Sequence, residues 1–310
     1  MILHGLLLDD PSDPPPLGWL RVDEASGRIV EKQLGEPPRV AEEAPIGGRD
    51  AVVCPGFIDA HTHPPQFDAV GVDGLPLLEW LDRVVYPAEI WWGRTGGVRL
   101  AERALDRLLH EGTLGVAGWL TSHAQAAWEV AQLAARGVRG NPPLRTILGR
   151  VAMDREAPEE LVREDRLRAQ QTPAPSPALP AQPASSRCQV SVNPRFVVAC
   201  TPELLAEIGW LLRDRPELVV QTHLAESPDE LARTRELFPD APHATAILDE
   251  HNLLGPRTLL AHCVHLTDEQ WRLIAQRRCV VVHCPQANLF LRSGLFNLDK
   301  AREHGVRLAL

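Results

Sequence analysis

The chain has 310 residues, of which 44% are hydrophobic and 24% are charged, and its formal net charge is −9. Length and composition fit one (β/α) barrel with additions, built around a sizeable apolar core. The negative charge argues against a nucleic-acid partner, because phosphate binding requires clustered lysine and arginine, and no run of about 18 apolar residues predicts a membrane span. The six cysteines form no C-x-x-C pair. This pattern is typical of reduced thiols, so we expect a cytoplasmic protein.

The first 52 residues contain strand patterns and no helical pattern. Apolar runs predict strands over 2–8 and 18–31, and the second folds back on itself at 24–27 as a β-hairpin. We therefore predict a small β-sandwich-like domain over residues 1–52.

Residues 53–310 alternate short apolar runs with helical segments. Such alternation is typical of an α/β protein with a buried parallel sheet. Strands are predicted over 51–63, 113–120, 144–153, 188–196, 218–226, 258–264 and 279–285. Helices are predicted over 99–112, 126–137, 201–214 and 268–278. An eighth strand begins with VRLAL at the end of the sequence, so we predict a (β/α)8 TIM-type barrel that is incomplete at strand eight.

A Pro/Ala/Ser-rich run over 170–187 interrupts this alternation. Its composition predicts an extended or disordered surface insertion in the barrel.

Polar residues cluster where the predicted barrel strands end. The carboxyl ends of the strands in a parallel barrel form one face, and active sites lie there. Four strands deliver histidine to this face, although the chain has only 12 histidines. The strand-end polar residues are His61, His63, Asn193, Arg195, His223, Glu226, His262, His265 and His283. Because residues i and i+2 of a strand share a face, His61 and His63 point the same way, and the set predicts a metal site.

The chemistry of these residues suggests their roles. Zinc prefers histidine nitrogen and carboxylate oxygen, so His61, His63 and His223 are the candidate ligands. Bound zinc lowers the pKa of water to about 7. Glu226 would then carry protons between that water and a substrate, and His262 would hydrogen-bond the attacking hydroxide.

Simpler structural roles remain open for several of these residues. His223 on its own fits a buried, hydrogen-bonded histidine, and Glu226 fits the cap of a helix that begins near Pro228. His265 is a weaker candidate for the site than His262, because His265 follows the end of the predicted strand. His283 fits a supporting or a structural position, and it has no assigned role.

Six segments resemble those of the guanine deaminases, a family of the amidohydrolase superfamily: PGFIDAHTHPPQ, GLPLLEWLDRVVYPAE, NPRFVVACTPELL, QTHLAES, LAHCVHL and HCPQANLFLRSGLFNL. The first is general to the superfamily up to its second histidine. The run LPLLEWLDRVVYPAE, the PQ after the histidine pair and the PRF of strand four are much more specific to guanine deaminases. The resemblance runs from about residue 52 to the end, except for the insertion and the segment before it.

The resemblance implies one zinc ion, held by His61, His63, His223 and an aspartate of strand eight. In the family this aspartate lies in a G-T-D run just after the strand written here as VRLAL, and this sequence ends first, at Leu310. We therefore expect the chain to bind zinc weakly and to have an open, unstable barrel edge.

The resemblance also implies that Gln66, Arg195 and Phe196 hold a purine, that Glu226 shuttles protons and that His262 supports the reacting water. Glutamine offers a donor and an acceptor to a base edge, arginine can donate to a carbonyl oxygen, and phenylalanine can stack on the ring. Without the resemblance, a solvent-exposed glutamine, a surface arginine and a core phenylalanine would be the preferred interpretations.

These observations predict a zinc-dependent hydrolase of purine catabolism that converts guanine to xanthine and ammonia. One alternative is a related aminohydrolase or chlorohydrolase that acts on another N-heterocycle. The other is a truncated barrel without catalytic activity. The resemblance also makes a homodimer an expectation.

Overall fold

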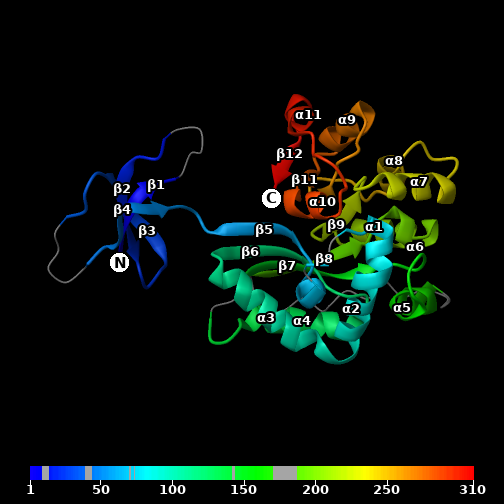
Figure 1. The fold of residues 1–310 in the computed structure, drawn as a ribbon, viewed down its shortest axis with the longest axis horizontal. Helices are drawn as coiled ribbons and strands as arrows, with labels where there is room; N and C mark the ends of the chain where they lie inside the picture. The colour runs from blue at the N-terminus through cyan, green and yellow to red at the C-terminus, as the bar shows by residue number, and fades with distance from the viewer. Residues whose placement is uncertain (9–13, 39–43, 70, 73, 142–143, 170–186) are drawn as a thin grey trace. The chain divides into compact units, whose positions relative to one another are not determined.

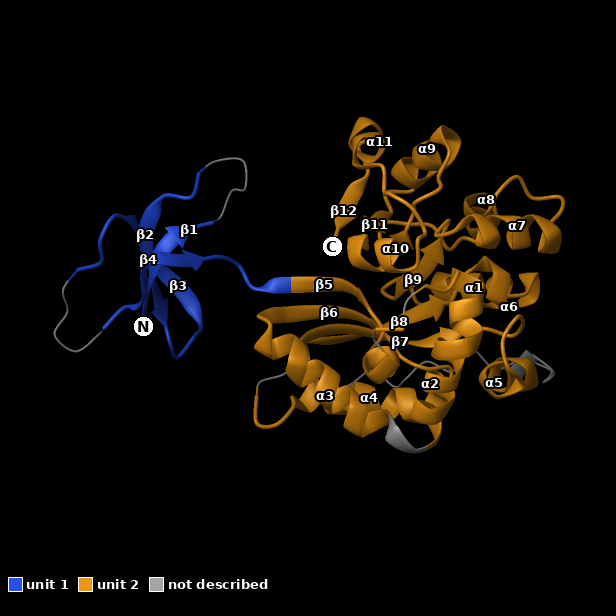
Figure 2. Cartoon of the chain, viewed as in Figure 1, with its two compact units in different colours: residues 1–57 blue, residues 58–310 orange. Residues whose placement is uncertain are grey.

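The computed structural model describes residues 1–8, 14–38, 44–69, 71–72, 74–141, 144–169 and 187–310. Within it the chain forms two compact units, Met1–Phe57 and Ile58–Leu310 (Figure 2). The predicted insertion over 170–187 lies outside the described residues, apart from Arg187.

The first unit is built on a single four-stranded sheet with the strand order β3-β2-β1-β4. Its strands are β1 (Ile2–Leu7), β2 (Leu17–Asp23), β3 (Arg28–Leu34) and β4 (Ile46–Val53). The antiparallel pairing of β2 with β3 confirms the predicted hairpin, and β4 adds to β1 in parallel. Ile2, Leu7 and Trp19 are buried in this unit, so apolar side chains from two neighbouring strands form its small core.

The single strand predicted over 51–63 is wrong. The structure has two strands there, because β4 ends at Val53 and β5 starts at Phe57. Pro55 and Gly56 lie between them. Proline has no N–H for a sheet ladder and glycine weakens a strand, so the apolar run breaks at this point.

The second unit contains an eight-stranded parallel sheet in which the strands follow one another in chain order. These strands are β5 (Phe57–Thr62), β6 (Thr113–Trp119), β7 (Arg145–Ala152), β8 (Cys188–Pro194), β9 (Val219–Leu224), β10 (Thr258–His262), β11 (Val280–Val282) and β12 (Arg307–Ala309). The Ala60 N–H donates to the Leu310 carbonyl at 2.8 Å, which links the first strand to the last. The predicted (β/α)8 barrel is confirmed, and a short eighth strand of three residues nearly closes it.

Helices connect the strands of this sheet, and most of them lie on its outside (Figure 1). They are α1 (Leu77–Trp80), α2 (Tyr86–Trp91), α3 (Gly97–His110), α4 (Ala124–Arg136), α5 (Glu159–Ala169), α6 (Pro202–Asp214), α7 (Pro228–Leu237), α8 (Ala244–Glu250), α9 (Asp268–Gln276), α10 (Pro285–Phe290) and α11 (Leu298–Glu303). At the start of α6, the Thr201 hydroxyl accepts the Leu204 N–H and Pro202 takes the first helical position, a standard arrangement for starting a helix. No helix in the described ranges has the length and apolar character to cross a membrane.

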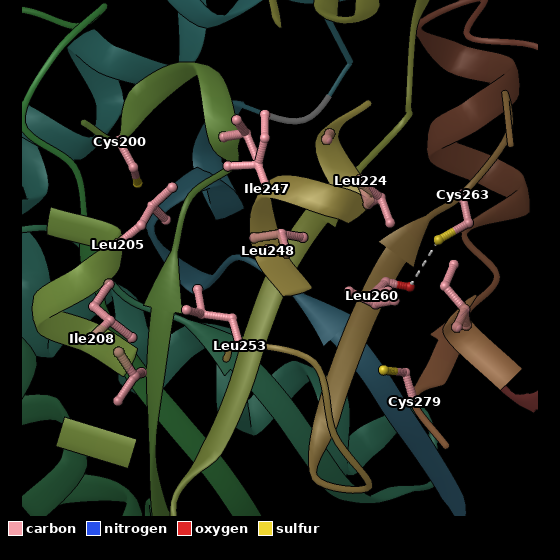
Figure 3. Close-up of a cluster of buried hydrophobic side chains, with 14 of the residues drawn as sticks. Cys200, Leu205, Ile208, Leu224, Ile247, Leu248, Leu253, Leu260, Cys263 and Cys279 are labelled. Carbon is pink, nitrogen blue, oxygen red and sulfur yellow. Dashed lines mark hydrogen bonds between the residues drawn. The ribbon is translucent and has the colours of Figure 1, made fainter. Parts of the chain in front are cut away.

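The largest core cluster lies between β9–β11 and the helices outside them (Figure 3). Leu205 and Ile208 of α6 and Ile247 and Leu248 of α8 are fully buried beside Leu260 of β10. The strands are apolar on both faces because one face points into the barrel and the other meets these helices. This packing fixes the positions of the strand ends, where the polar residues lie.

Candidate active site

The strand-end histidines lie around one cavity of about 410 Å³. His61 and His63 come from the end of β5, His223 from β9 and His262 from the last position of β10. All four line the cavity. His63, His61 and His223 are called the histidine cluster below.

The Nε2 atoms of the histidine cluster converge. His63 Nε2 lies 3.3 Å from His61 Nε2 and 3.1 Å from His223 Nε2. The His223 Nδ1–H donates to the Arg195 carbonyl at 2.6 Å, which leaves Nε2 of a neutral His223 ring with a bare lone pair. Two bare nitrogens at this distance repel each other unless a cation or a proton lies between them.

The surroundings keep these rings neutral. Burial lowers the pKa of His61, His63 and His223 well below the usual value, and the neighbouring imidazoles lower the pKa of each further. Neutral imidazoles are the form that binds metal. Two ligand nitrogens on a tetrahedral zinc ion are expected about 3.3 Å apart, so the donor atoms fit such an ion.

A second set of three rings also places nitrogens together. The ring nitrogens of His61, His223 and His262 lie within 4.8 Å of one another. His63 fits the ligand position better than His262, because its separations match the spacing of ligands on one ion and because His262 makes other contacts. A group of histidines that could hold a metal ion is therefore present in the barrel.

His262 and Glu226 face each other beside the histidine cluster. His262 Nδ1–H donates to Asn288 Oδ1 at 2.7 Å, and its Nε2 lies 3.4 Å from Glu226 Oε2. Both side chains are buried. Burial raises the pKa of Glu226 to about 8, although the charge of Arg195 acts in the opposite direction. A carboxyl group with this pKa can take up and release a proton near neutral pH.

Unusual backbone conformations aim these two side chains. Ala225, His262 and Cys263 have φ values of 51°, 71° and 52°, in the left-handed region that costs roughly 1 kcal/mol or more for a residue other than glycine. The two oxygens of Glu230 accept the N–H groups of Ala225 and Glu226 at 3.1 and 2.6 Å. These bonds hold the turn after β9 in place.

The alternative interpretation of Glu226 as a helix cap is wrong. Ser227 is the N-cap of α7, because its hydroxyl accepts the Glu230 N–H at 3.2 Å. The side chain of Glu226 instead lines the cavity.

Three predicted purine-binding residues lie on another side of the same cavity: Gln66, Arg195 and Phe196. Both oxygens of Glu89 accept from Arg195 Nη1, at 3.0 and 2.9 Å. The Gln66 Nε2 atom lies 3.5 Å from Glu89 Oε1. Gln66, Glu89 and Arg195 are called the arginine cluster below. The arginine and the phenylalanine are buried, which differs from the surface arginine expected without the resemblance.

His265 and His283 do not line the cavity. The His265 Nε2 lies 2.6 Å from the Ser293 carbonyl. His283 stacks on Phe296 with 4.7 Å between the ring centroids. Both therefore have structural contacts.

The sequence pattern does not predict three residues of the site: Glu89, Trp119 and Asn288. The Trp119 ring lies 4.3 Å from His223 and 5.3 Å from His63 between centroids, so it forms a wall behind the histidine cluster. Its position at the end of β6 is a usable signal, because strand ends form the active face. For Glu89, the signal is a charge inside a run of apolar and aromatic residues.

Comparison with known proteins places this site in a family. The family model described as "Amidohydrolase family" matches residues 52–310. The chain belongs to the amidohydrolase family. The match covers the whole barrel and includes each residue of the histidine and arginine clusters.

Similar proteins give the relationship more detail. A guanine deaminase of Dictyostelium discoideum is 33% identical over 274 residues, which are 87% of this chain and 59% of the relative. The crystal structure of a guanine deaminase from C. acetobutylicum with bound guanine has a TM-score of 0.81 at 25% identity, and the match covers 100% of this chain and 73% of that one. An adenosine deaminase from Xanthomonas campestris with bound zinc shares the fold, with a TM-score of 0.70 at 22% identity over 99% of this chain and 67% of that one.

This amidohydrolase chain spans about three fifths of the length of the curated relatives that it matches.

Proposed function

We propose that the chain carries the catalytic barrel of a guanine deaminase, which hydrolyses guanine to xanthine and ammonia. The observation that supports this best is that the histidine cluster, Glu226, Gln66 and Arg195 all line one cavity. The similarity to guanine deaminases supports the choice of guanine among possible substrates.

One zinc ion per chain is the proposed cofactor, and His61, His63 and His223 are its proposed ligands. Three neutral histidine nitrogens at ligand spacing support this choice. When bound, zinc supplies hydroxide at neutral pH, because it lowers the pKa of water to about 7.

Glu226 is the proposed proton carrier. Glu226 would take one proton from the attacking water and pass it to a ring nitrogen of guanine. It would then take the remaining water proton from the hydroxyl group formed at C2 and pass it to the amine that leaves from C2. The water oxygen ends in the new carbonyl of xanthine, and the amine leaves as ammonia. His262 holds the carboxyl in place from 3.4 Å, and Asn288 fixes the orientation of that ring.

Gln66, Arg195 and Phe196 are the proposed base-binding residues. Arg195 donates to the guanine carbonyl oxygen, Gln66 contacts the adjacent ring edge, and Phe196 packs against the ring. Burial of Arg195 strengthens such a contact, because water competes less there.

The decisive experiment is to incubate the zinc-loaded protein with guanine and measure xanthine and ammonia. Equal rates of formation are expected. Glu226→Gln should retain zinc and lose about 1,000-fold or more in turnover. A folded, zinc-bound protein that forms neither product from guanine would overturn the proposal, and a panel of other amino- and chloro-heterocycles would then test the related activities. A folded protein that binds no zinc would favour a barrel without catalysis.

We also propose that the protein is cytoplasmic and forms a homodimer. The six cysteines are all in the described part of the chain and none is paired in a disulfide, which supports a reducing compartment. The homodimer rests on the resemblance alone, and the molecular mass in solution tests it.

A further inference from the structure

Glu89 is a buried carboxylate that the proposed reaction does not use. It lies in α2 between two π-helical segments, Leu81–Val85 and Trp92–Gly96, and its relative exposure is 0%. Interruptions of this kind in a helix are frequent at functional sites. Glu89 is the only charged residue of α2, and its side chain contacts two residues that line the cavity, Gln66 and Arg195.

Among the described residues, the hydrogen bonds of the Glu89 side chain are with Arg195 and Gln66, which both line the cavity. Both carboxylate oxygens bind one nitrogen of Arg195, Nη1. The guanidinium also lies 5.2 Å from the centroid of the Tyr86 ring, one turn earlier on the helix. Glu89 thus fixes the arginine through one nitrogen, and the other nitrogens of that fork remain as donors for a ligand.

Glu89 also determines which way the Gln66 amide points. A carboxylate only accepts hydrogen bonds, so the side of the amide that faces it at 3.5 Å is the NH2 group. The Gln66 carbonyl oxygen is then left as an acceptor beside the cavity that this residue lines. The two side chains together present donors from arginine next to an acceptor from glutamine.

We infer that Glu89 is a positioning residue that sets this donor–acceptor pattern. The pattern makes the site select a lactam edge, which has adjacent C=O and N–H groups, over a ring edge that has an NH2 group beside a bare ring nitrogen. This inference rests on the proposed function for the identity of the substrate. Arginine satisfies the lactam oxygen and the glutamine oxygen satisfies the lactam N–H. The opposite edge would leave donors facing donors and an acceptor facing an acceptor.

A second buried ion pair provides a matched comparison. Arg150 and Asp165 are also buried, with 2.9 Å between Nη1 and Oδ1. Arg150 Nε donates to the Ser122 carbonyl at 2.6 Å and Asp165 Oδ2 accepts the Met153 N–H at 3.0 Å. Neither residue of the pair lines the cavity. We therefore expect the loss of this pair to lower stability without a change in which base binds.

The test is calorimetric binding of hypoxanthine and adenine to the zinc-loaded protein. Hypoxanthine carries the lactam edge and adenine the opposite edge, and neither has an amino group at C2. We expect the wild type to bind hypoxanthine about 10-fold or more tighter than adenine. Glu89→Gln should reduce this affinity ratio by about 10-fold, because the new amide can donate as well as accept and therefore allows the Gln66 amide to rotate by 180°. Glu89→Asp, which still only accepts, should retain most of the preference, and Asp165→Asn should lower the melting temperature with the ratio unchanged.

A folded Glu89→Gln protein with the wild-type ratio would overturn the inference. If that variant does not fold, Gln66→Met keeps the ion pair but removes the acceptor, and an unchanged ratio there would overturn it equally. The outcomes also separate the two proposals. If the protein converts guanine but the affinity ratio is the same in the wild type and in Glu89→Gln, only the positioning role is contradicted. If the affinity ratio depends on Glu89 but guanine is not converted, only the proposed deaminase activity is contradicted.

Discussion

The two sides of the cavity are built in different ways. The histidine cluster stands on β5 and β9, regular strands held by the sheet, and its positions follow from the strand ends. The arginine cluster comes from a 3-10 turn, an interrupted helix and the residue after β8, and a single carboxylate joins its members. The cavity thus combines the proposed metal-binding nitrogens, held by regular strands, with a proposed base-binding set that depends on side-chain pairing.

Arg195 connects the two sides. Its backbone carbonyl accepts from His223 in the histidine cluster, while its guanidinium binds Glu89. A change at Glu89 should therefore act first on the proposed base-binding residues, and it should reach the proposed metal ligands only through the position of the Arg195 carbonyl. This separation makes the two sides independently testable.

The largest expected effect is the loss of one histidine of the cluster. His63→Ala removes the nitrogen that lies 3.3 Å from His61 Nε2 and 3.1 Å from His223 Nε2, so bound zinc should fall well below the wild-type content and turnover should fall by more than about 1,000-fold. Zinc content by atomic absorption and xanthine formation measure the two effects. His283→Ala is the matched control, because this strand-end histidine lies outside the cavity. Equal losses in both variants would show that the cluster has no special role.

A smaller effect is expected from Glu230, which supports the turn between the two sides. Its two oxygens accept from Ala225 and Glu226. Glu230→Gln replaces one acceptor with an NH2 group that faces a backbone donor, so Glu226 should move and kcat should fall by about 10- to 100-fold with KM nearly unchanged. Steady-state kinetics on guanine measure the change.

The control for this prediction is Glu236→Gln on the same helix. Glu236 is an exposed residue that pairs with Arg233 at the surface. The role assigned to Glu230 would fail if both variants had wild-type kcat, or if Glu230→Gln raised KM alone.

Much of the histidine side can be predicted from sequence. Alternation of apolar strands with helices places the strand ends on one face, and this rule alone is enough to group the histidine cluster with His262 around one cavity. The boundary between β4 and β5 is harder to predict, because a continuous apolar pattern hides the break that proline and glycine cause.

The arginine side resists prediction for a physical reason. Glu89 and Arg195 are 106 residues apart in the sequence, and no periodicity connects a helix residue to a residue that follows a strand. The π-helical segments on either side of α2 shift the helical face, so helical spacing does not show which way Glu89 points. Resemblance indicates Gln66 and Arg195, but not the carboxylate between them.

The last prediction concerns Glu226, which lies between the two sides, and the dependence of stability on pH. Burial raises its pKa to about 8 in the folded protein, whereas an unfolded glutamate has a pKa of about 4.3. Between these values the folded state holds a proton that the unfolded state has released. The free energy of unfolding of the zinc-free protein should therefore fall as pH rises from about 5 to about 8, by an amount on the order of 3 kcal/mol.

Glu226→Gln cannot lose this proton, so its chemical denaturation curves should show a flatter pH dependence and greater stability at about pH 8. A residual slope should remain, because burial raises the pKa of Glu230 to about 7. Parallel pH profiles for the variant and the wild type would mean that Glu226 is ionised in the folded protein and that Arg195 balances its charge. The charge of Arg195 would then couple the arginine cluster to Glu226 more strongly than the distances indicate.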